Sequence, residues 1–387
     1  MFRPSLIGAS GTKALQSSTL NVPGDFPTIS DALAFIDGNP ILSGARFTIR
    51  IAATPNGFYR ESLRFVKRHY QNVTIEGAAP IVATSTSVAV SGVAPDWTVV
   101  LTFANNVLST AALAAKFVTI QAISDPGNAA DAGLSGTWEV VSTTATTVTL
   151  KVLVWGLASM SATPPSGQFK AIAFPTRLRS AYLPGFLKDA FFAGVNSTLP
   201  TLKNLLLDGD RSFDGTNIEQ VGISLDNSNI TIQSDYADLP GIAITRTSAG
   251  LSVGSCSTFY GALSVSDCQT NGITCVGASR MFSPLLMSQG NQGLGCGVSQ
   301  SSYAAISPSD MSAPSRLCGN YGSGLSIAEG AHAIMTSGSI IANFTSAQVL
   351  AQSTGLTTLG GTAQLLTGTI SPTANTAGNF NSYNRRY

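Results

Sequence analysis

The first quarter of the chain contains short hydrophobic runs whose period changes along the sequence. The apolar residues that follow Thr28 recur at helical spacing, and Asp31 stands three residues after Thr28, which is typical of a helix N-terminus. Gly38 occupies the position where a left-handed C-cap is expected. The segments 46–52 and 72–78 instead alternate apolar and polar residues, which indicates half-buried strands. This region predicts a short amphipathic helix followed by strands.

Residues 85–160 carry a different pattern, in which β-branched runs are separated by short polar or glycine-containing turns. The four runs are 97–103, 116–123, 137–143 and 147–154. The last two are typical of a β-hairpin, because only a short polar turn separates them. We therefore expect a small antiparallel β-domain inserted into or beside the main body.

A four-residue motif recurs through residues 200–365: Gly, then Ile or Leu, then any residue, then Leu, Ile or Cys. It begins at Gly222, Gly241, Gly272, Gly293 and Gly324, at intervals of 19, 31, 21 and 31 residues. Three short strands with their turns occupy roughly 20–25 residues, one coil of a parallel β-helix, and an inserted loop lengthens a coil. Leucine-rich repeats are the main competitor, but no regular Leu and Asn template is visible. We expect these glycines to mark successive coils.

The N-terminal pattern resembles a known family. The runs DFPTISDALAFIDG, ARFTIRIA and NVTIEGA, between residues 25 and 78, are similar to the opening of pectin-lyase-like β-helices, where a capping helix precedes the first coils. Phage tail fibres and tailspikes of this superfamily often begin in this way and commonly carry inserted β-domains. The resemblance implies an all-β fold: a right-handed parallel β-helix with a short N-terminal capping helix and an inserted small antiparallel β-domain. GFYRES (57–62) also resembles an element of pectin methylesterases, but its spacing differs and their catalytic strand is absent, so no catalytic residue carries over.

These patterns divide the chain into five parts. We expect an N-terminal attachment arm at 1–19, the start of the β-helix with its capping helix at 20–84, the inserted β-domain at 85–160, the shaft at 161–365, and a C-terminal cap or tail at 366–387. Some cap is required, because an open β-helix end exposes strand edges.

Composition narrows the function classes. Charged residues make up 11% of the chain, against roughly 25% in a typical soluble domain, while a hydrophobic fraction of 44% argues against disorder. A chain with so few charges must solvate its surface with hydroxyl and amide groups, or bury much of that surface between subunits. We expect a homotrimer. A net charge of +1 gives no electrostatic case for nucleic acid. No apolar run approaches the ~18 residues of a spanning helix, so we expect no signal peptide and no membrane insertion.

The five cysteines all lie between residues 256 and 318. Their odd number and the lack of CxxC pairs argue against a disulfide framework or a zinc site. We interpret them as core positions of a protein folded in a reducing cytoplasm. A Walker A loop is also absent from the sequence. We expect no cofactor and no metal.

Three carboxylates are candidate catalytic residues. Asp208 and Asp210 would lie on one face of a strand, and Asp226, one coil further on, could stack near them. Glycosidases need two carboxylates, and oxygen ligands could also bind a cation. The alternative is that the Asp-Gly pairs of this segment form turns at the edge of a coil.

Aromatic residues of the later coils are candidates for glycan binding, because sugars stack on ring faces. They are Phe259, Tyr260, Phe282, Tyr303 and Tyr321. The alternative is that they fill a subunit interface. Either role would place them on the outside of the solenoid.

Fold alone does not determine function, so three hypotheses stay open. The first is a structural virion protein of a phage tail, a homotrimeric fibre or spike that is assembled in the host cytoplasm. It would attach to other tail or baseplate proteins and contact a host surface glycan or receptor. The second is a tailspike that depolymerises polysaccharide as an endoglycosidase or lyase. The third is a purely structural tail or collar component.

Overall fold

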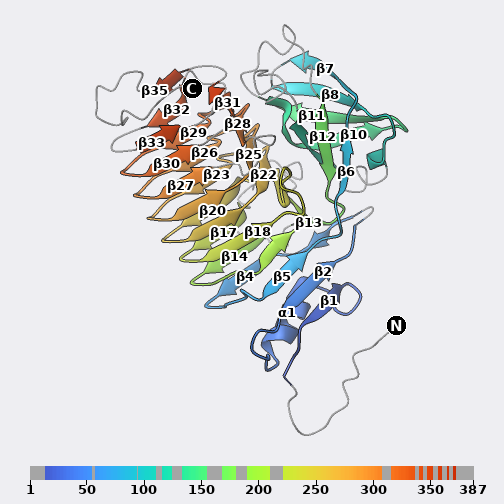
Figure 1. Ribbon diagram of the computed structural model, residues 1–387, viewed down its shortest axis with the longest axis vertical. Coiled ribbons are helices and arrows are strands. Elements are labelled where there is room, and N and C mark those ends of the chain that lie inside the picture. Colours follow the sequence, from blue (N-terminus) through green and yellow to red (C-terminus); the bar gives the residue numbers. More distant parts are fainter. Residues whose placement is uncertain are drawn as a thin grey trace.

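The computed structural model describes residues 14–54, 57–93, 95–109, 116–123, 133–154, 168–179, 190–209, 221–306 and 315–335, together with 340–342, 347–351, 356–359, 364–365 and 369–371. They form the right-handed parallel β-helix that the sequence predicts, with a small antiparallel sheet at its side (Figure 1). Most of the predicted attachment arm and C-terminal tail lies outside the described residues.

Three parallel sheets form the walls of the helix. Sheet 1 contains β1 (Ser18–Val22), β2 (Phe47–Ile51), β5 (Val73–Glu76), β15 (Thr201–Lys203), β18 (Asn229–Gln233), β21 (Thr258–Gly261), β24 (Arg280–Ser283), β27 (Tyr303–Ile306), β30 (His332–Met335) and β33 (Leu356–Leu359). Sheet 2 contains β3 (Tyr59–Arg60), β13 (Arg177–Arg179), β16 (Leu205–Asp208), β19 (Ile242–Thr245), β22 (Leu263–Ser266), β25 (Leu286–Gln289), β28 (Arg316–Cys318), β31 (Ile340–Ala342) and β34 (Gln364–Leu365). Sheet 3 contains β4 (Leu63–Val66), β14 (Phe192–Val195), β17 (Val221–Asp226), β20 (Ala249–Gly254), β23 (Ile273–Cys275), β26 (Cys296–Val298), β29 (Leu325–Ile327), β32 (Ala347–Ala351) and β35 (Thr369–Ser371).

The core is built from in-facing columns, because strands of successive coils pair in parallel and in register. One column of sheet 3 is formed by residues that are direct partners from coil to coil. Its members are Leu63, Phe192, Ile223, Leu251, Ile273, Cys296 and Leu325, and all of them are buried. Alternation of side chains along each strand places the neighbouring residues outside. The outer faces of the three sheets are therefore where any site on the shaft must lie.

A column of glycines runs along the start of the sheet 3 strands, but it differs from the predicted one. Its members are Gly222, Gly250, Gly272, Gly295 and Gly324, whose backbones approach each other closely. A Cβ on Gly222 would lie 2.4 Å from the carbonyl oxygen of Gly250, and one on Gly250 would lie 2.6 Å from that of Gly272. Two predicted markers are wrong for this column: Gly241 precedes β19 in sheet 2, and Gly293 stands two residues before Gly295. The glycines are required by close backbone contact between coils.

A column of buried serines follows the turn between sheet 3 and sheet 1. Its members are Ser197, Ser228, Ser257, Ser279 and Ser302, and each of the first four donates its backbone N–H to the Oγ of the next, at 2.9–3.1 Å. The residue before each serine has a left-handed backbone, with φ between 46° and 61°. This turn replaces strand pairing by a side-chain ladder, which satisfies buried N–H groups where the coil bends.

The described residues contain one α-helix, α1 (Ile29–Asp37), which closes the N-terminal end of the core as predicted. Thr28 caps it: its Oγ1 accepts from the N–H of Asp31 at 3.0 Å. The predicted left-handed C-cap is wrong, because Gly38 has φ −80° and donates its N–H to Ala34, which continues the right-handed turn. The buried face of Ile29, Ala32, Leu33 and Ile36 packs on the first coils.

Glu61 ties α1 to the next coil. Its carboxylate accepts from the N–H of Ile29 at 2.9 Å and from the hydroxyl of Ser30 at 3.1 Å, and the residue is buried. A carboxylate suits a helix N-terminus, where backbone N–H groups lack intrahelical partners. Burial raises the pKa of Glu61, and the bonds from Ile29 and Ser30 oppose this effect.

The antiparallel sheet is inserted between β5 and β13. Its strands are β6 (Ile81–Thr84), β7 (Ser87–Val93), β8 (Asp96–Thr102), β9 (Phe117–Ala122), β10 (Gly136–Thr143), β11 (Thr147–Leu153) and β12 (Phe169–Ala173). The predicted hairpin is present as β10 and β11. The sheet extends beyond 85–160 at both ends, because β12 pairs with β6 before the chain returns to the helix. It has its own core, which includes Trp138, Phe103 and Phe169.

The antiparallel sheet packs against the outer face of sheet 2 through polar contacts. Thr137 donates its N–H to the Oγ of Ser266 at 2.9 Å, and its Oγ1 lies 2.8 Å from the Oγ of Ser264. Higher in the stack, Arg316 donates to the Oγ of Ser135 and to the carbonyl of Ala122, both at 2.8 Å. Apolar residues also meet at this junction, where Phe117 and Ile172 of the antiparallel sheet cluster with Leu206 and Ala243 of sheet 2. Polar and apolar contacts together hold the antiparallel sheet on the shaft.

Four cysteines are buried as expected, and one is not. Cys268, Cys275, Cys296 and Cys318 are buried, whereas Cys256 is exposed. Cys256 holds the left-handed turn position before Ser257, with φ 61°, so the prediction of a core position is wrong there. Burial raises the pKa of Cys275 to about 12, which keeps this thiol protonated and unreactive.

Candidate functional site

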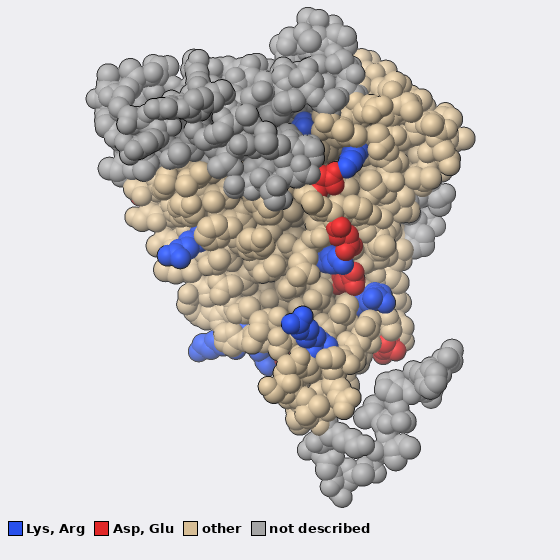
Figure 2. Space-filling model, in the orientation of Figure 1, with Lys and Arg blue, Asp and Glu red and all other residues tan. Residues whose placement is uncertain are grey.

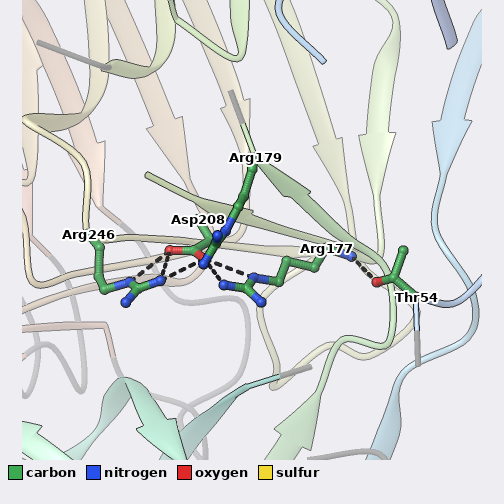
Figure 3. A network of polar contacts seen from close by, with 5 residues as sticks. All are labelled: Thr54, Arg177, Arg179, Asp208 and Arg246. Atoms are coloured by element: carbon green, nitrogen blue, oxygen red, sulfur yellow. Dashed lines mark hydrogen bonds and ion pairs between the residues drawn. The ribbon is translucent and has the colours of Figure 1, made fainter. Parts of the chain in front are cut away.

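Asp208 lies at the centre of a buried arginine cluster (Figure 3). Arg246 donates through Nε to Oδ1 at 2.8 Å and through Nη2 to Oδ2 at 2.8 Å. Arg177 donates through Nε to Oδ2 at 2.8 Å, and Arg179 donates through Nε to the same oxygen at 3.1 Å. Both carboxylate oxygens are thus occupied by charged donors. The arginines come from β13 and from the turn after β19, the coils on either side of β16.

The electrostatics of this cluster favour an anchoring role for Asp208. Burial alone would raise its pKa, but the guanidinium groups of Arg246, Arg177 and Arg179 outweigh burial and lower the pKa below its usual value. A carboxylate held in this state has no proton to give as a general acid. The Arg246 guanidinium also lies over the ring of Phe117 in the antiparallel sheet, 4.8 Å from its centroid. The cluster therefore joins the insertion to the shaft.

The other candidate carboxylates do not complete a pair with Asp208. Asp226 is exposed at the end of β17 in sheet 3, where its partners in the adjacent coils are Val195 and Gly254. Asp208 belongs to sheet 2, so these two residues lie in different sheets and do not stack on each other. Asp210 lies outside the described residues. The buried cluster around Asp208 and the exposed Asp226 are therefore separate features.

Three of the five candidate aromatic residues form a continuous strip on the outer face of sheet 1. Tyr260 is the direct cross-strand partner of Phe282. The ring of Phe282 lies 5.8 Å from that of Tyr303, and Tyr303 lies 5.5 Å from the ring of His332 in edge-on geometry. We name these four residues the aromatic strip. Tyr260 is 54% exposed, and the other three are half-buried, so ring surface faces solvent along four coils.

Phe259 and Tyr321 do not belong to this strip. Phe259 is fully buried, because it alternates with Tyr260 along β21 and faces the core, so an outer position was wrong for it. Tyr321 is exposed in the turn after β28. His332 was missing from the candidate set, although its place in β30 follows from the spacing of the coils. The alternation of inward and outward residues along each strand could have indicated which of these aromatic side chains face outward.

Charge on the outer face of sheet 1 is concentrated at its N-terminal end. Lys203 pairs with Glu76 at 3.1 Å and with Asp235 at 2.6 Å, and Arg50 approaches Glu76 at 3.8 Å. The aromatic strip includes no charged carboxylate or lysine, and Arg280 is the direct partner of Tyr303. Figure 2 shows that one face of the molecule is mostly uncharged, with a few spots of Lys, Arg, Asp and Glu.

A cleft of about 200 Å³ opens where the antiparallel sheet meets the shaft. The antiparallel sheet contributes Phe117, Thr137, Trp138, Glu139, Lys151 and Leu153, and the shaft contributes Thr245, Arg246 and Asp267. Glu139 and Lys151 are exposed cross-strand partners on β10 and β11. Sequence reasoning did not find these residues, because the cleft depends on how the two sheets pack.

In the described part of the chain, no group of three or more His, Cys, Asp or Glu side chains is placed to hold a metal ion. No helix among the described residues is long and apolar enough to cross a membrane.

Comparisons with known proteins add little. No family model and no curated protein matches the chain. Among solved structures, the chain is similar to the tailspike protein gp49 from Pseudomonas phage LKA1, with 11% sequence identity and a TM-score of 0.21. The match covers 89% of this chain and 76% of that one. Likeness at this level carries no argument about function, which must come from the residues of the chain.

Proposed function

We propose that the chain is a structural component of a phage tail, a fibre or spike, that binds a host-surface glycan through the aromatic strip. The observation that carries this proposal is the row of Tyr260, Phe282, Tyr303 and His332 on the outer face of a rigid solenoid. Parallel coils hold the four rings at fixed spacing, so a linear saccharide can contact several of them at once. Sites on regular elements keep such geometry better than sites on loops.

The chemistry of the strip favours a glycan over a protein ligand. Rings that present partly exposed faces suit the C–H faces of sugars, and Arg280 and His332 beside Tyr303 can donate to hydroxyls. The resemblance of residues 25–78 to tailspike-type β-helices supports the same class of partner. A chain with 11% charged residues also suits a surface that contacts uncharged saccharides.

The assembly that we propose is a homotrimer within the virion tail, made in the host cytoplasm and attached to other tail or baseplate proteins. The low charge supports it, because outer surface that is shared between subunits needs few charges for solvation. Light scattering tests the mass of the purified chain directly, and a stable monomer would remove this support. Immunogold labelling of particles that contain the chain tests its place in the tail.

The glycan proposal is tested by substituting residues of the aromatic strip and measuring both polysaccharide binding and the mass of the protein in solution. We expect Tyr260→Ala, Phe282→Ala and Tyr303→Ala combined to abolish binding to purified bacterial surface polysaccharides on biosensors, with the mass in solution unchanged. The matched control is Tyr236→Ala, which removes an exposed tyrosine outside the strip. Unchanged polysaccharide binding in the triple variant contradicts the proposal, and a changed mass with binding retained identifies the strip as a subunit contact.

The two other hypotheses are outcomes of the same assay. New reducing ends, or unsaturated products, after incubation with polysaccharide identify a depolymerase. Failure of the unmodified chain to retain any polysaccharide favours a purely structural tail or collar component.

A further inference from the structure

The cleft between the antiparallel sheet and the shaft has features of a ligand site that is separate from the aromatic strip. It lies on the outer side of sheet 2, whereas the strip lies on sheet 1. Its volume of about 200 Å³ is below the roughly 300 Å³ at which pockets for drug-sized ligands begin. The space therefore suits a single ring, and the exposed Glu139 and Lys151 mark its opening to solvent.

Two shaft residues reach this cleft from backbone positions that disfavour side chains. Arg246 and Asp267 follow aligned strands of sheet 2 and have left-handed backbones, with φ 55° and 54°. The next two coils place Gly290 and Gly319 at the equivalent corner, with φ 61° and 63°. A non-glycine residue in this region costs of order 1–3 kcal/mol and persists where the surroundings or the function demand it. A Cβ on Gly290 would lie 2.1 Å from the carbonyl oxygen of Leu153, and one on Gly319 would lie 2.6 Å from the side chain of Val154. The antiparallel sheet therefore leaves room for side chains only at the first two corners, which face the cleft.

One unsatisfied polar atom lines the cleft, and two more lie further along the same junction. The hydroxyl oxygen of Thr245 is buried and has no hydrogen-bond partner in the described part of the chain, although Thr245 lines the cleft. Gln289, in the same outer column of sheet 2 two coils further on, is also fully buried, and neither of its amide atoms has a partner among the described residues. Buried polar groups are normally paired, so the junction holds hydrogen-bonding capacity that the described residues do not use.

The composition of the lining identifies the chemistry of the ligand. The cleft is lined by two acidic side chains, Glu139 and Asp267, and by two basic ones, Lys151 and Arg246. Arg246 is held by Asp208, and Lys151 lies 3.8 Å from Asp96. Donors and acceptors stand together beside the apolar surface of Phe117, Trp138 and Leu153. A hydroxyl both donates and accepts, so a polyhydroxylated ring with an apolar face can satisfy both kinds of group. We propose that this cleft binds one neutral sugar ring, with Glu139 and Asp267 accepting from its hydroxyls and Lys151 donating to them.

Saturation-transfer NMR on the full chain with neutral methyl glycosides tests the site. Methyl glucoside, methyl galactoside, methyl mannoside and methyl N-acetylglucosaminide are the probes. We expect transfer to at least one of them, and a loss of affinity of about tenfold or more in Glu139→Ala, since a hydrogen bond to a charged group contributes on the order of 1.5–3 kcal/mol. The matched control is Glu329→Ala, an exposed glutamate in a turn of the shaft.

A second pair of variants separates the cleft from the aromatic strip. Thr245→Val should weaken the same probe, whereas Thr274→Val, on the outer face of sheet 3, should not. Tyr303→Ala should leave this binding unchanged, because Tyr303 lies on sheet 1. No transfer to any of the four glycosides, or equal affinity in Glu139→Ala and its control, would overturn the proposal. Either result leaves the aromatic strip to be judged by its own polysaccharide assay.

Discussion

Ser197 donates its backbone N–H to the Oγ of Ser228, which lies one coil further along the helix at 2.9 Å. The N–H of Ser228 in turn donates to the Oγ of Ser257 at 3.0 Å. Each hydroxyl of this column is therefore both an element of its own turn and the partner of the previous coil. The ladder couples neighbouring coils at a corner where strand pairing stops.

Removing one hydroxyl of this ladder should destabilise the shaft. We expect Ser228→Ala to lower the free energy of unfolding by about 1–3 kcal/mol, because the buried N–H of Ser197 loses its acceptor. Denaturant titration followed by circular dichroism measures the change. Ser252→Ala, on the outer face of β20, is the control and should change stability by less than about 0.5 kcal/mol. Equal effects in both variants would show that the ladder contributes nothing specific.

The buried arginine cluster predicts a larger loss. Asp208→Asn keeps the shape of the side chain but leaves Arg177 and Arg246 without their buried counter-charge, and we expect a cost of about 3–5 kcal/mol. The exposed Asp226→Asn is the control. A variant at Asp208 as stable as the control would mean that the cluster is not an anchor.

The same cluster has a defined pH dependence. Since the pKa of Asp208 is lowered in the folded protein, its stabilising effect is present above its ordinary value of 3.8 and is lost as pH falls through the folded-state pKa. Denaturation midpoints measured from neutral to acid pH should therefore fall more steeply for the unmodified chain than for Asp208→Asn. Parallel curves would contradict this assignment.

Glu61 should behave in the opposite sense. Burial is the main cause of its raised pKa, so the folded protein favours the neutral form of this carboxyl group. Its contribution to stability is therefore present below the ordinary pKa of 4.5 and is lost as pH rises through the folded-state pKa. Glu61→Gln removes that loss while keeping an oxygen acceptor for the N–H of Ile29. We expect the stability of Glu61→Gln relative to the unmodified chain to improve between acid and neutral pH. A pH-independent difference in the denaturation midpoints would argue against a titrating Glu61.

Local sequence patterns predicted much of the secondary structure, because caps and hairpins depend on interactions between residues that are close in sequence. The cap at Thr28 and the β10–β11 hairpin depend on residues close in sequence. The coil register was harder to predict. Gly241 fits the four-residue motif as well as the true column does, and Gly250 was overlooked because Val253 replaces the expected Leu, Ile or Cys. The serine column was hidden because a different residue type often precedes each serine.

The sites depended on contacts that sequence patterns do not encode. Asp208 meets arginines that lie about 30–40 positions away along the chain, as the hydrogen bonds from Arg177 and Arg246 show. The cleft needs β10 to be packed against sheet 2, more than 100 residues apart, as the bond from Thr137 to Ser266 illustrates. Alternation along a strand predicts that Phe259 and Tyr260 face opposite sides of the sheet. Fixing which of the two faces the core requires the register of the coil.

The cysteines offer a test of the burial pattern. Cys256 is exposed in a turn, whereas burial raises the pKa of Cys275 to about 12 and also raises that of Cys296. Only thiolates react readily with disulfide reagents. We therefore expect one thiol per chain to react rapidly with Ellman's reagent in the native protein and all five to react in denaturant. Cys256→Ser should remove the rapid phase and leave stability nearly unchanged, whereas Cys296→Ser should destabilise the core column between Ile273 and Leu325. A rapid phase of more than one thiol would mean that at least one of the four buried cysteines is accessible, which contradicts the burial pattern.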